Sequence, residues 1–157
     1  MKKIYPSSNE IEKLADRLAE KIIKSKEKFD IILGISRGGL FPGIYLSDRL
    51  SLPLAVISCS AYKKGTKESR DIKEIKISDG ISTLSPLEGK VLLVDDLVDS
   101  GGTMKKLYKK LRNQDKNTKT AVLYIKPWSK FKPDYYIKTT DAWVIFPYQK
   151  KEYKDLK

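Results

Sequence analysis

Residues 91–103 have the sequence Val91-Leu92-Leu93-Val94-Asp95-Asp96-Leu97-Val98-Asp99-Ser100-Gly101-Gly102-Thr103, and this stretch decides the fold. Its first four residues form a short apolar run, which is typical of a strand buried on both faces of a parallel sheet. Because two acidic residues follow the run, we expect the strand to end at them. A glycine-rich turn comes next and leads into a helix whose apolar residues lie at helical spacing: Met104, Leu107, Tyr108 and Leu111.

The chain before this stretch has the same alternation of helix and strand. Ser7 and Glu10 form a capping box, which predicts the start of an amphipathic helix with apolar residues at Ile11, Leu14, Ala15, Leu18 and Ile22. Residues 30–35 are a second short apolar run, and they lead into Ser36-Arg37-Gly38-Gly39. Residues 40–50 predict a helix that packs through Phe41, Ile44 and Tyr45 or Leu46.

Further strands are expected at residues 54–57 and 121–125, with one more in the aromatic segment after Lys126. Residues 62–73 are polar and basic and have no apolar periodicity, so we expect a mobile loop there. The predicted fold class is α/β, an open and mostly parallel twisted sheet flanked by helices. The turns that follow its parallel strands should face one crevice at the carboxyl edge of the sheet.

The composition limits both organisation and chemistry. The 157 residues show no linker and no internal repeat, so we expect one domain over residues 1–157. No apolar run reaches the roughly 20 residues of a membrane helix, and we expect a cytoplasmic protein with no membrane partner. Cys59 is the only cysteine and histidine is absent, which excludes an intramolecular disulfide, histidine-based triads and multi-cysteine zinc sites. The net charge of +12 favours nucleic acid or small polyphosphates as partners.

The stretch at 91–103 also suggests a ligand. Ser100, Gly101, Gly102 and Thr103 place small residues and backbone N–H groups at a helix N-terminus, which favours a phosphate dianion. Asp95 and Asp96 offer acceptor-only carboxylates suited to the vicinal hydroxyls of a sugar and to Mg²⁺. A phosphate beside a diol describes ribose 5-phosphate. The phosphate-binding motifs of nucleoside triphosphatases and dinucleotide enzymes are absent.

At this point residues 91–103 resemble the 5-phosphoribosyl-1-pyrophosphate (PRPP) signature of the type I phosphoribosyltransferases. Residues 35–40 resemble that family's pyrophosphate loop, and residues 143–147 resemble the base-binding tail of bacterial xanthine-guanine phosphoribosyltransferases. The sequence departs from the pattern at Ala61-Tyr62, where Ser-Tyr is frequent, and at Pro147-Tyr148-Gln149, where Pro-Trp-acid is usual.

The resemblance implies a role for each residue at the PRPP end of the crevice. PRPP would contact the whole string Asp95, Asp96, Leu97, Val98, Asp99, Ser100, Gly101, Gly102 and Thr103, with Asp96 also binding Mg²⁺. Arg37 and Gly38 would hold the pyrophosphate, and Arg70 of the hood loop would close over it. Tyr62 would supply the hood's catalytic hydroxyl, and Asp99 would accept the proton of the purine.

At the other end, the resemblance implies a purine pocket made by Lys126, Trp143 and Val144, together with Asp99. A lysine at a strand end only donates hydrogen bonds, so it suits the O6 atom of guanine, xanthine or hypoxanthine and opposes adenine. Trp143 would stack on the base. The family leads us to expect a homotetramer or homodimer that uses Mg²⁺.

Several alternatives stay open from the sequence. Asp99 could be the N-cap of the following helix, Arg37 an ordinary surface arginine, and Trp143 a core residue. The whole chain could be a ligand sensor or nucleic-acid-binding regulator that retains this fold. The intact acids at Asp95, Asp96 and Asp99 and the scattered Lys and Arg residues make nucleic acid an unlikely partner. An adenine or pyrimidine phosphoribosyltransferase conflicts with Lys126 and Trp143.

Overall fold

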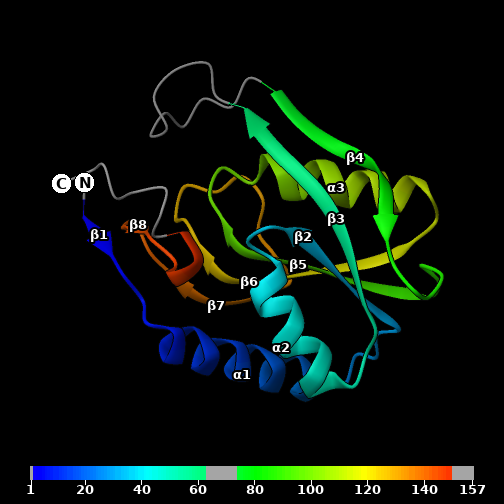
Figure 1. Ribbon diagram of the computed structural model, residues 1–157, viewed down its shortest axis with the longest axis horizontal. Coiled ribbons are helices and arrows are strands. Elements are labelled where there is room, and N and C mark those ends of the chain that lie inside the picture. Colours follow the sequence, from blue (N-terminus) through cyan, green and yellow to red (C-terminus); the bar gives the residue numbers. More distant parts are fainter. Residues whose placement is uncertain (1, 63–73, 150–157) are drawn as a thin grey trace.

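The computed structural model describes residues 2–62 and 74–149 and contains an α/β sheet flanked by helices (Figure 1). The main sheet has the strand order β4-β3-β2-β5-β6-β7. Its strands are β2 (Ile31–Ser36), β3 (Leu54–Tyr62), β4 (Glu74–Ser82), β5 (Lys90–Val98), β6 (Asn117–Ile125) and β7 (Tyr135–Thr139). All neighbours pair in parallel except β3 and β4, so the expected fold class is confirmed.

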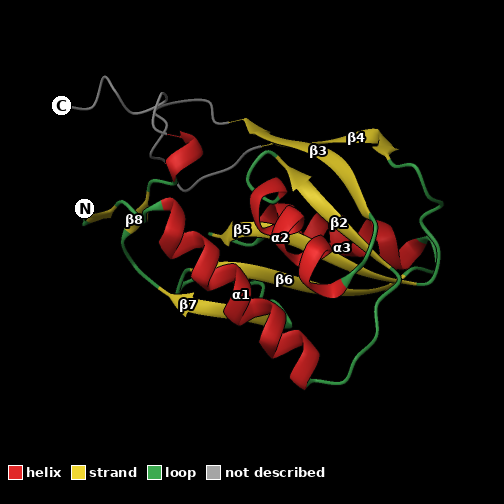
Figure 2. Ribbon diagram, turned by 60° about the horizontal axis from the view of Figure 1, so that its bottom comes forward, coloured by secondary structure: helices red, strands yellow, loops and turns green. Residues whose placement is uncertain are grey.

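Helices cover both faces of this sheet. Helix α1 (Ser8–Lys24) begins at the predicted capping box, in which Ser7 Oγ accepts from the backbone N–H of Glu10 at 3.2 Å. It packs with α2 (Leu40–Leu50) on one face, and Figure 2 shows α1 running across β6 and β7. Helix α3 (Gly102–Asn113) covers the opposite face through Met104, Leu107 and Leu111. No helix within the two described ranges is long and apolar enough to cross a membrane.

The two central strands form a topological switch point. The chain leaves β2 through α2 toward β3, and it leaves β5 through α3 toward β6, in opposite directions across the sheet. Because β2 and β5 are hydrogen-bonded neighbours, the turns after them diverge and leave a crevice at the carboxyl edge of the sheet. The turn at residues 36–39 and the turn at residues 99–101 both lie there, as the sequence predicts.

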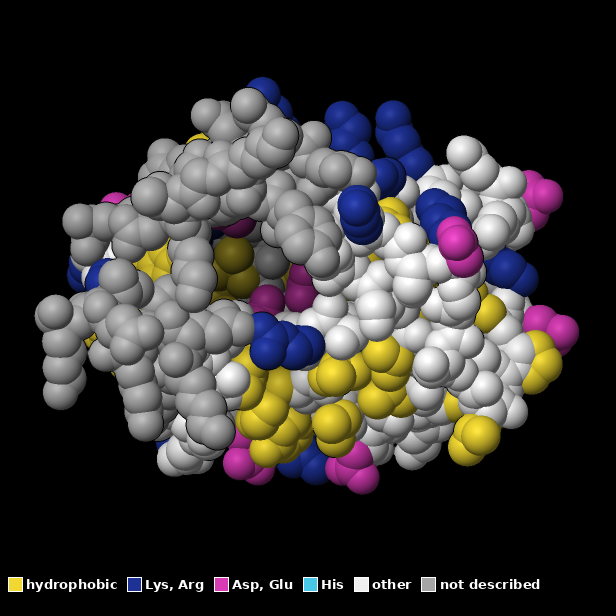
Figure 3. Space-filling view, turned by 45° about the horizontal axis from the view of Figure 1, so that its top comes forward, with side chains coloured by type: hydrophobic (Ala, Val, Ile, Leu, Met, Phe, Trp, Pro, Cys, Tyr) yellow, Lys and Arg dark blue, Asp and Glu magenta, His cyan; other side chains and the backbone are white. Residues whose placement is uncertain are grey.

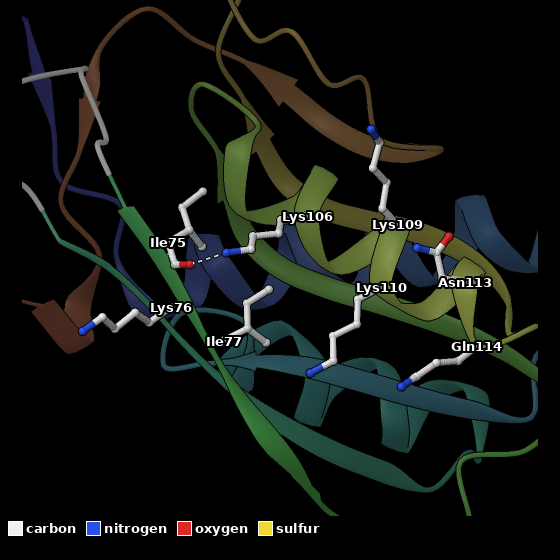
Figure 4. Close-up of a pocket in the computed structure, with 8 residues that line it drawn as sticks. All are labelled: Ile75, Lys76, Ile77, Lys106, Lys109, Lys110, Asn113 and Gln114. Carbon is white, nitrogen blue, oxygen red and sulfur yellow. Dashed lines mark hydrogen bonds between the residues drawn. The ribbon is translucent and has the colours of Figure 1, made fainter.

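Strand β4 was not expected from the sequence. It forms an antiparallel edge strand on β3, and residues 63–73 between the two strands lie outside the described residues. Figure 4 shows lysines of α3 beside β4, and in it Lys106 Nζ donates to the carbonyl oxygen of Ile75 at 2.6 Å. Lys110 Nζ also donates to the carbonyl oxygen of Ser78, at 3.3 Å. These contacts satisfy carbonyl groups of an edge strand, where charged side chains also discourage pairing with another chain.

Three further expectations need correction. Strand β5 does not end at Asp95 but runs on to Val98, because its ladder with β6 continues to the pair Val98 and Ile125. Ile44 does not pack inward and is 58% exposed, since the buried face of α2 is made by Pro42, Gly43 and Leu46. The tail holds two strands rather than one, β7 and the short β8 (Trp143–Val144), which pairs in parallel with β1 (Lys3–Ile4).

Gly39 supports a test of how tightly the turn after β2 packs on the sheet. A Cβ atom at this position would lie 2.3 Å from the carbonyl oxygen of Val94 and 2.7 Å from the backbone nitrogen of Ile35. These are backbone atoms held in the sheet, so they cannot move aside without disturbing its strands. We therefore expect Gly39→Ala to lower the free energy of unfolding by about 1 to 3 kcal/mol in urea denaturation. Gly80→Ala is the matched control, because a Cβ there meets nothing within 4 Å, and we expect a change below about 0.5 kcal/mol. Equal effects at both positions would contradict this packing.

Candidate active site

The turn between β5 and α3 encloses a small cavity of about 110 Å³. Its lining contains nearly all of the residues predicted to contact PRPP in this stretch: Asp95, Leu97, Val98, Asp99, Ser100, Gly101, Gly102 and Thr103, with Met104 behind them. Figure 3 shows a hollow on this side of the molecule, with acidic side chains (magenta) inside it. The structure therefore brings the predicted phosphate cradle together in one concave site.

The first turn of α3 is arranged so that its backbone amides have little competition from side chains. The N-cap is Gly101, whose φ of 86° is in the left-handed region, and it provides no side-chain cap. The nearest contact is Ser100 Oγ, which accepts from the backbone N–H of Gly102 at 3.4 Å. Open amides and the helix dipole together favour an anion here. Because the cap is Gly101, the alternative interpretation of Asp99 as the N-cap is wrong.

Two adjacent carboxylates lie just before this cradle, inside the crevice. Asp96 is only 7% exposed, and its backbone N–H donates to Asp95 Oδ1 at 2.9 Å. Burial raises the pKa of Asp95, and the neighbouring charge of Asp96 raises it further. Burial also raises the pKa of Asp96, although a hydrogen bond from Tyr148 opposes that shift. Keeping these two carboxylates away from water opposes folding, and carboxylates with pKa values shifted in this way are typical of functional sites.

The turn after β2 lies directly against these carboxylates. A Cβ atom at Gly38 would stand 2.4 Å from Asp96 Oδ2, so only glycine lets the backbone approach this closely. The preceding peptide bond, between Ser36 and Arg37, is cis. The exposed Arg37 lines a second cavity of about 690 Å³, which the predicted pyrophosphate loop shares with Phe41, Cys59 and Tyr148.

Tyr148 is a site residue that the sequence reasoning missed. Its hydroxyl donates to Asp96 Oδ2 at 2.7 Å, and its ring stacks on Phe146 and Phe41 with centroid distances of 5.3 and 5.5 Å. Burial, with the nearby charge of Asp96, raises the pKa of Tyr148, so the phenol keeps its proton and remains a donor. The aromatic tail at residues 146–148 was the signal that could have revealed this contact.

Cys59 lines this second cavity, and the acidic residues near it bear on metal binding. Burial and the charge of Asp95 raise the pKa of the Cys59 thiol to about 11, which disfavours a thiolate nucleophile. In the part of the chain that the structure describes, no group of three or more acidic or cysteine side chains could hold a metal by itself. Mg²⁺ often takes one or two carboxylates and completes its shell with substrate phosphates and water, and Asp95 and Asp96 fit that arrangement.

The predicted purine-binding residues lie together at the other end of the crevice. Lys126 follows β6, is 4% exposed, and donates through Nζ to the carbonyl oxygen of Ala142, the residue before β8. Trp143 is half-buried and Val144 is buried, and β1 holds both in place by strand pairing. The backbone N–H of Lys126 donates to the carbonyl oxygen of Val98 at 2.9 Å, which fixes Lys126 beside the turn that carries Asp99.

Trp128 is a second residue that the sequence reasoning missed. Its indole N–H donates to Asp99 Oδ1 at 2.7 Å, and Lys126 Nζ lies 5.5 Å from the centroid of its ring. Of the two predicted hood residues, Tyr62 is the last residue of β3, and Arg70 lies outside the described residues. Trp128 thus contacts both Asp99 and Lys126.

Comparison with known proteins agrees with this geometry. The family described as phosphoribosyl transferase domain matches residues 3–153. The chain belongs to the phosphoribosyltransferase family. A xanthine-guanine phosphoribosyltransferase of Idiomarina loihiensis is 29% identical over 150 residues, which cover 94% of this chain and 87% of the relative. A hypoxanthine-guanine phosphoribosyltransferase of Lactococcus lactis is 30% identical over 145 residues, or 86% of this chain and 75% of the relative.

A solved structure of this phosphoribosyltransferase family also superposes closely. The purine phosphoribosyltransferase from Pyrococcus horikoshii has a TM-score of 0.79 and 32% sequence identity, and the match covers 95% of both chains. The agreement extends over nearly all of the sheet and helices, so the fold resemblance stated from residues 91–103 is confirmed.

The half-buried carboxylate of Asp95 predicts how the stability of this phosphoribosyltransferase depends on pH. Folding raises the pKa of Asp95 above its ordinary value of 3.8, so the folded protein holds that proton more tightly than the unfolded chain. The resulting stabilisation is fully present below the unfolded pKa and is lost as the pH rises through the folded pKa. We therefore expect Asp95→Asn to raise the free energy of unfolding at pH 7 by about 1 kcal/mol and to change it little near pH 3.

Chemical denaturation across this pH range measures the effect, with Asp79→Asn on the exposed surface of β4 as the control. An Asp95→Asn variant that is less stable than the wild type at pH 7 and equal to it near pH 3 would show that the Asp95 charge stabilises the fold, contrary to this account.

Proposed function

We propose that the protein transfers the 5-phosphoribosyl group of PRPP to a 6-oxopurine, giving the nucleoside 5′-monophosphate and pyrophosphate. One arrangement carries the proposal: a helix N-terminus without a side-chain cap and a carboxylate pair follow one another at the end of β5, and a buried lysine follows the neighbouring strand β6. These features match, in order, a 5′-phosphate, a ribose diol and the O6 atom of a purine. The names of the relatives support the same substrate class.

PRPP binding falls to residues on both sides of the switch point. Residues 100–103 receive the 5′-phosphate in the cavity that Asp95 also lines, and Asp95 and the adjacent Asp96 bind the ribose hydroxyls. Arg37 and the backbone at Gly38 hold the pyrophosphate, at the rim of the larger cavity. Asp96, with Asp95, would hold Mg²⁺, which would supply positive charge to offset the negative charge of the leaving pyrophosphate.

Asp99 is proposed as the proton acceptor. As purine N9 forms a bond to C1′ with inversion, the bond from C1′ to the pyrophosphate oxygen breaks and its electron pair leaves with pyrophosphate. The proton on N7 of the purine passes to the Asp99 carboxylate. Asp99 lines the cradle cavity and is half-buried, so it lies where the reacting sugar would be.

Further parts of the proposal rest on the resemblance, except the cytoplasmic location, which rests on the absence of a membrane-length apolar run. Tyr62 would supply a catalytic hydroxyl, and Arg70 would close over the pyrophosphate and help exclude water. The active form would be a homotetramer or homodimer in the cytoplasm. The rival regulator hypothesis is not favoured, because the acids needed for transfer are all present and the relatives are named as enzymes.

Nucleotide formation tests the function directly. The protein is incubated with PRPP, Mg²⁺ and one base at a time, and the products are separated by anion-exchange chromatography. We expect guanine, xanthine and hypoxanthine to give nucleotides and excess chelator to stop the reaction. Turnover of adenine at a kcat/KM comparable to that of guanine would refute the assignment, and tight RNA binding without turnover of any base would favour a regulator.

Lys126 predicts the basis of base selectivity. Its ammonium group is buried and anchored on Ala142, so it can donate to O6 but meets the amino group of adenine as a like donor. We expect Lys126→Met to lower the ratio of kcat/KM for guanine over adenine by about 10-fold or more. Lys130→Met, an exposed lysine in the same loop, is the control. An unchanged ratio in the Lys126 variant would exclude this lysine as the selecting group.

Asp99 and Asp95 should differ in what they contribute. Asp99→Asn removes the proton acceptor, so we expect kcat to fall by about 100-fold or more with little change in the KM for PRPP. Asp95→Asn removes a sugar contact and should raise the KM for PRPP as well. Steady-state kinetics at saturating guanine separate the two effects, and an equal loss of PRPP affinity in both variants would contradict the division of roles.

A further inference from the structure

Trp128 makes a direct hydrogen bond to the proposed proton acceptor. The distance from Trp128 Nε1 to Asp99 Oδ1 is 2.7 Å, at the short end of the range for N–H···O contacts and typical of a charged acceptor. Asp99 is thereby held by a side chain that is itself fixed in the fold. The two residues are 29 positions apart in the sequence, so the tertiary fold and not local geometry brings them together.

The segment that carries Trp128 is fixed on both sides. The backbone N–H of Lys126 donates to Val98, and that of Ser129 donates to the carbonyl oxygen of Lys126 at 3.0 Å, which closes a turn around Trp128. After it, the backbone N–H of Lys130 donates to the carbonyl oxygen of Ser100 at 3.3 Å. The indole is therefore held beside Asp99 by protein contacts that need no ligand.

Core packing does not account for this tryptophan. Trp128 is half-buried, and it is not among the residues of the two hydrophobic clusters in the described ranges. Its polar edge meets Asp99, and Lys126 Nζ lies over its ring. Trp128 thus contacts both residues that are proposed to recognise the neighbouring N7 and O6 atoms on one edge of the purine.

We infer that Trp128 is a positioning residue that fixes Asp99 for proton transfer, an inference that rests on the proposed function. The indole N–H engages Oδ1 and leaves Oδ2 of Asp99 to accept the proton of the purine. An indole N–H only donates, so it does not compete for that proton. The same ring sets the spacing between Asp99 and the ammonium group of Lys126. The proton acceptor and the hydrogen-bond donor can then meet N7 and O6 of the same purine.

Kinetics of Trp128→Phe test the inference, because phenylalanine keeps an aromatic ring and lacks the N–H group. We expect kcat/KM for guanine to fall by about 10- to 100-fold, the usual cost of losing a hydrogen bond to a charged group, while the KM for PRPP stays within about twofold. In an Asp99→Asn background the same substitution should cost less than about twofold, because the residue that it positions no longer accepts the proton. Lys130→Met in the same turn is the control.

An NMR measurement tests the hydrogen bond between Trp128 and Asp99 independently of the proposed enzymatic function. The chain has two tryptophans, so an ¹⁵N-labelled sample should give two indole N–H peaks, and Trp128→Phe identifies which belongs to Trp128. We expect Asp99→Asn to shift that peak and leave the peak of Trp143 in place, whether or not the protein turns over any base. An unmoved peak, or an equal kinetic cost of Trp128→Phe in both backgrounds, would overturn the inference.

Discussion

The withdrawal from water of two adjacent carboxylates near the end of β5, the half-buried Asp95 and the buried Asp96, is the constraint on which the rest of the site depends. Asp95 and Asp96 lie where the sheet opens, and removing their charges from water opposes folding, as the raised pKa of each shows. The neighbouring structure compensates with specific contacts. Tyr148 donates to Asp96, the backbone N–H of Asp96 donates to Asp95, and the turn at Gly38 comes close enough that no side chain fits between.

The sheet topology explains why these contacts meet at one place. The chain leaves β2 and β5 in opposite directions, so the space beyond their carboxyl ends is not covered by a crossover helix. The turn after β2 brings Arg37, the turn after β5 brings the phosphate cradle, and the turn after β6 brings Lys126 and Trp128. Each turn contributes a different chemical function, and strand pairing sets their relative positions.

Much of the fold and of the site could be predicted from the sequence, because the deciding signals are local. The capping box at Ser7 and the apolar run at 91–94 place α1 and β5 without tertiary information. Strand β4 was missed even though Ile75 and Ile77 alternate with polar residues, since it is a polar edge strand with few apolar residues. Tyr148 and Trp128 were missed for a different reason. The aromatic residues at 146–148 draw attention to the tail, but the hydrogen-bond partners of Tyr148 and Trp128 lie 52 and 29 positions away and cannot be identified from spacing along the chain.

The account's central claim is that the same carboxylates which oppose folding bind Mg²⁺ and PRPP, and ligand-dependent thermal unfolding tests it most directly. With Mg²⁺ and PRPP at about 100 times the dissociation constant, the melting temperature of the wild type should rise by about 5 to 10 °C. Under the same conditions the melting temperature of the Asp95→Asn variant should rise by less than about 2 °C, because the contact of Asp95 with the sugar is lost. An Asp95→Asn variant stabilised as strongly as the wild type would show that PRPP binds without this carboxylate and would contradict the account.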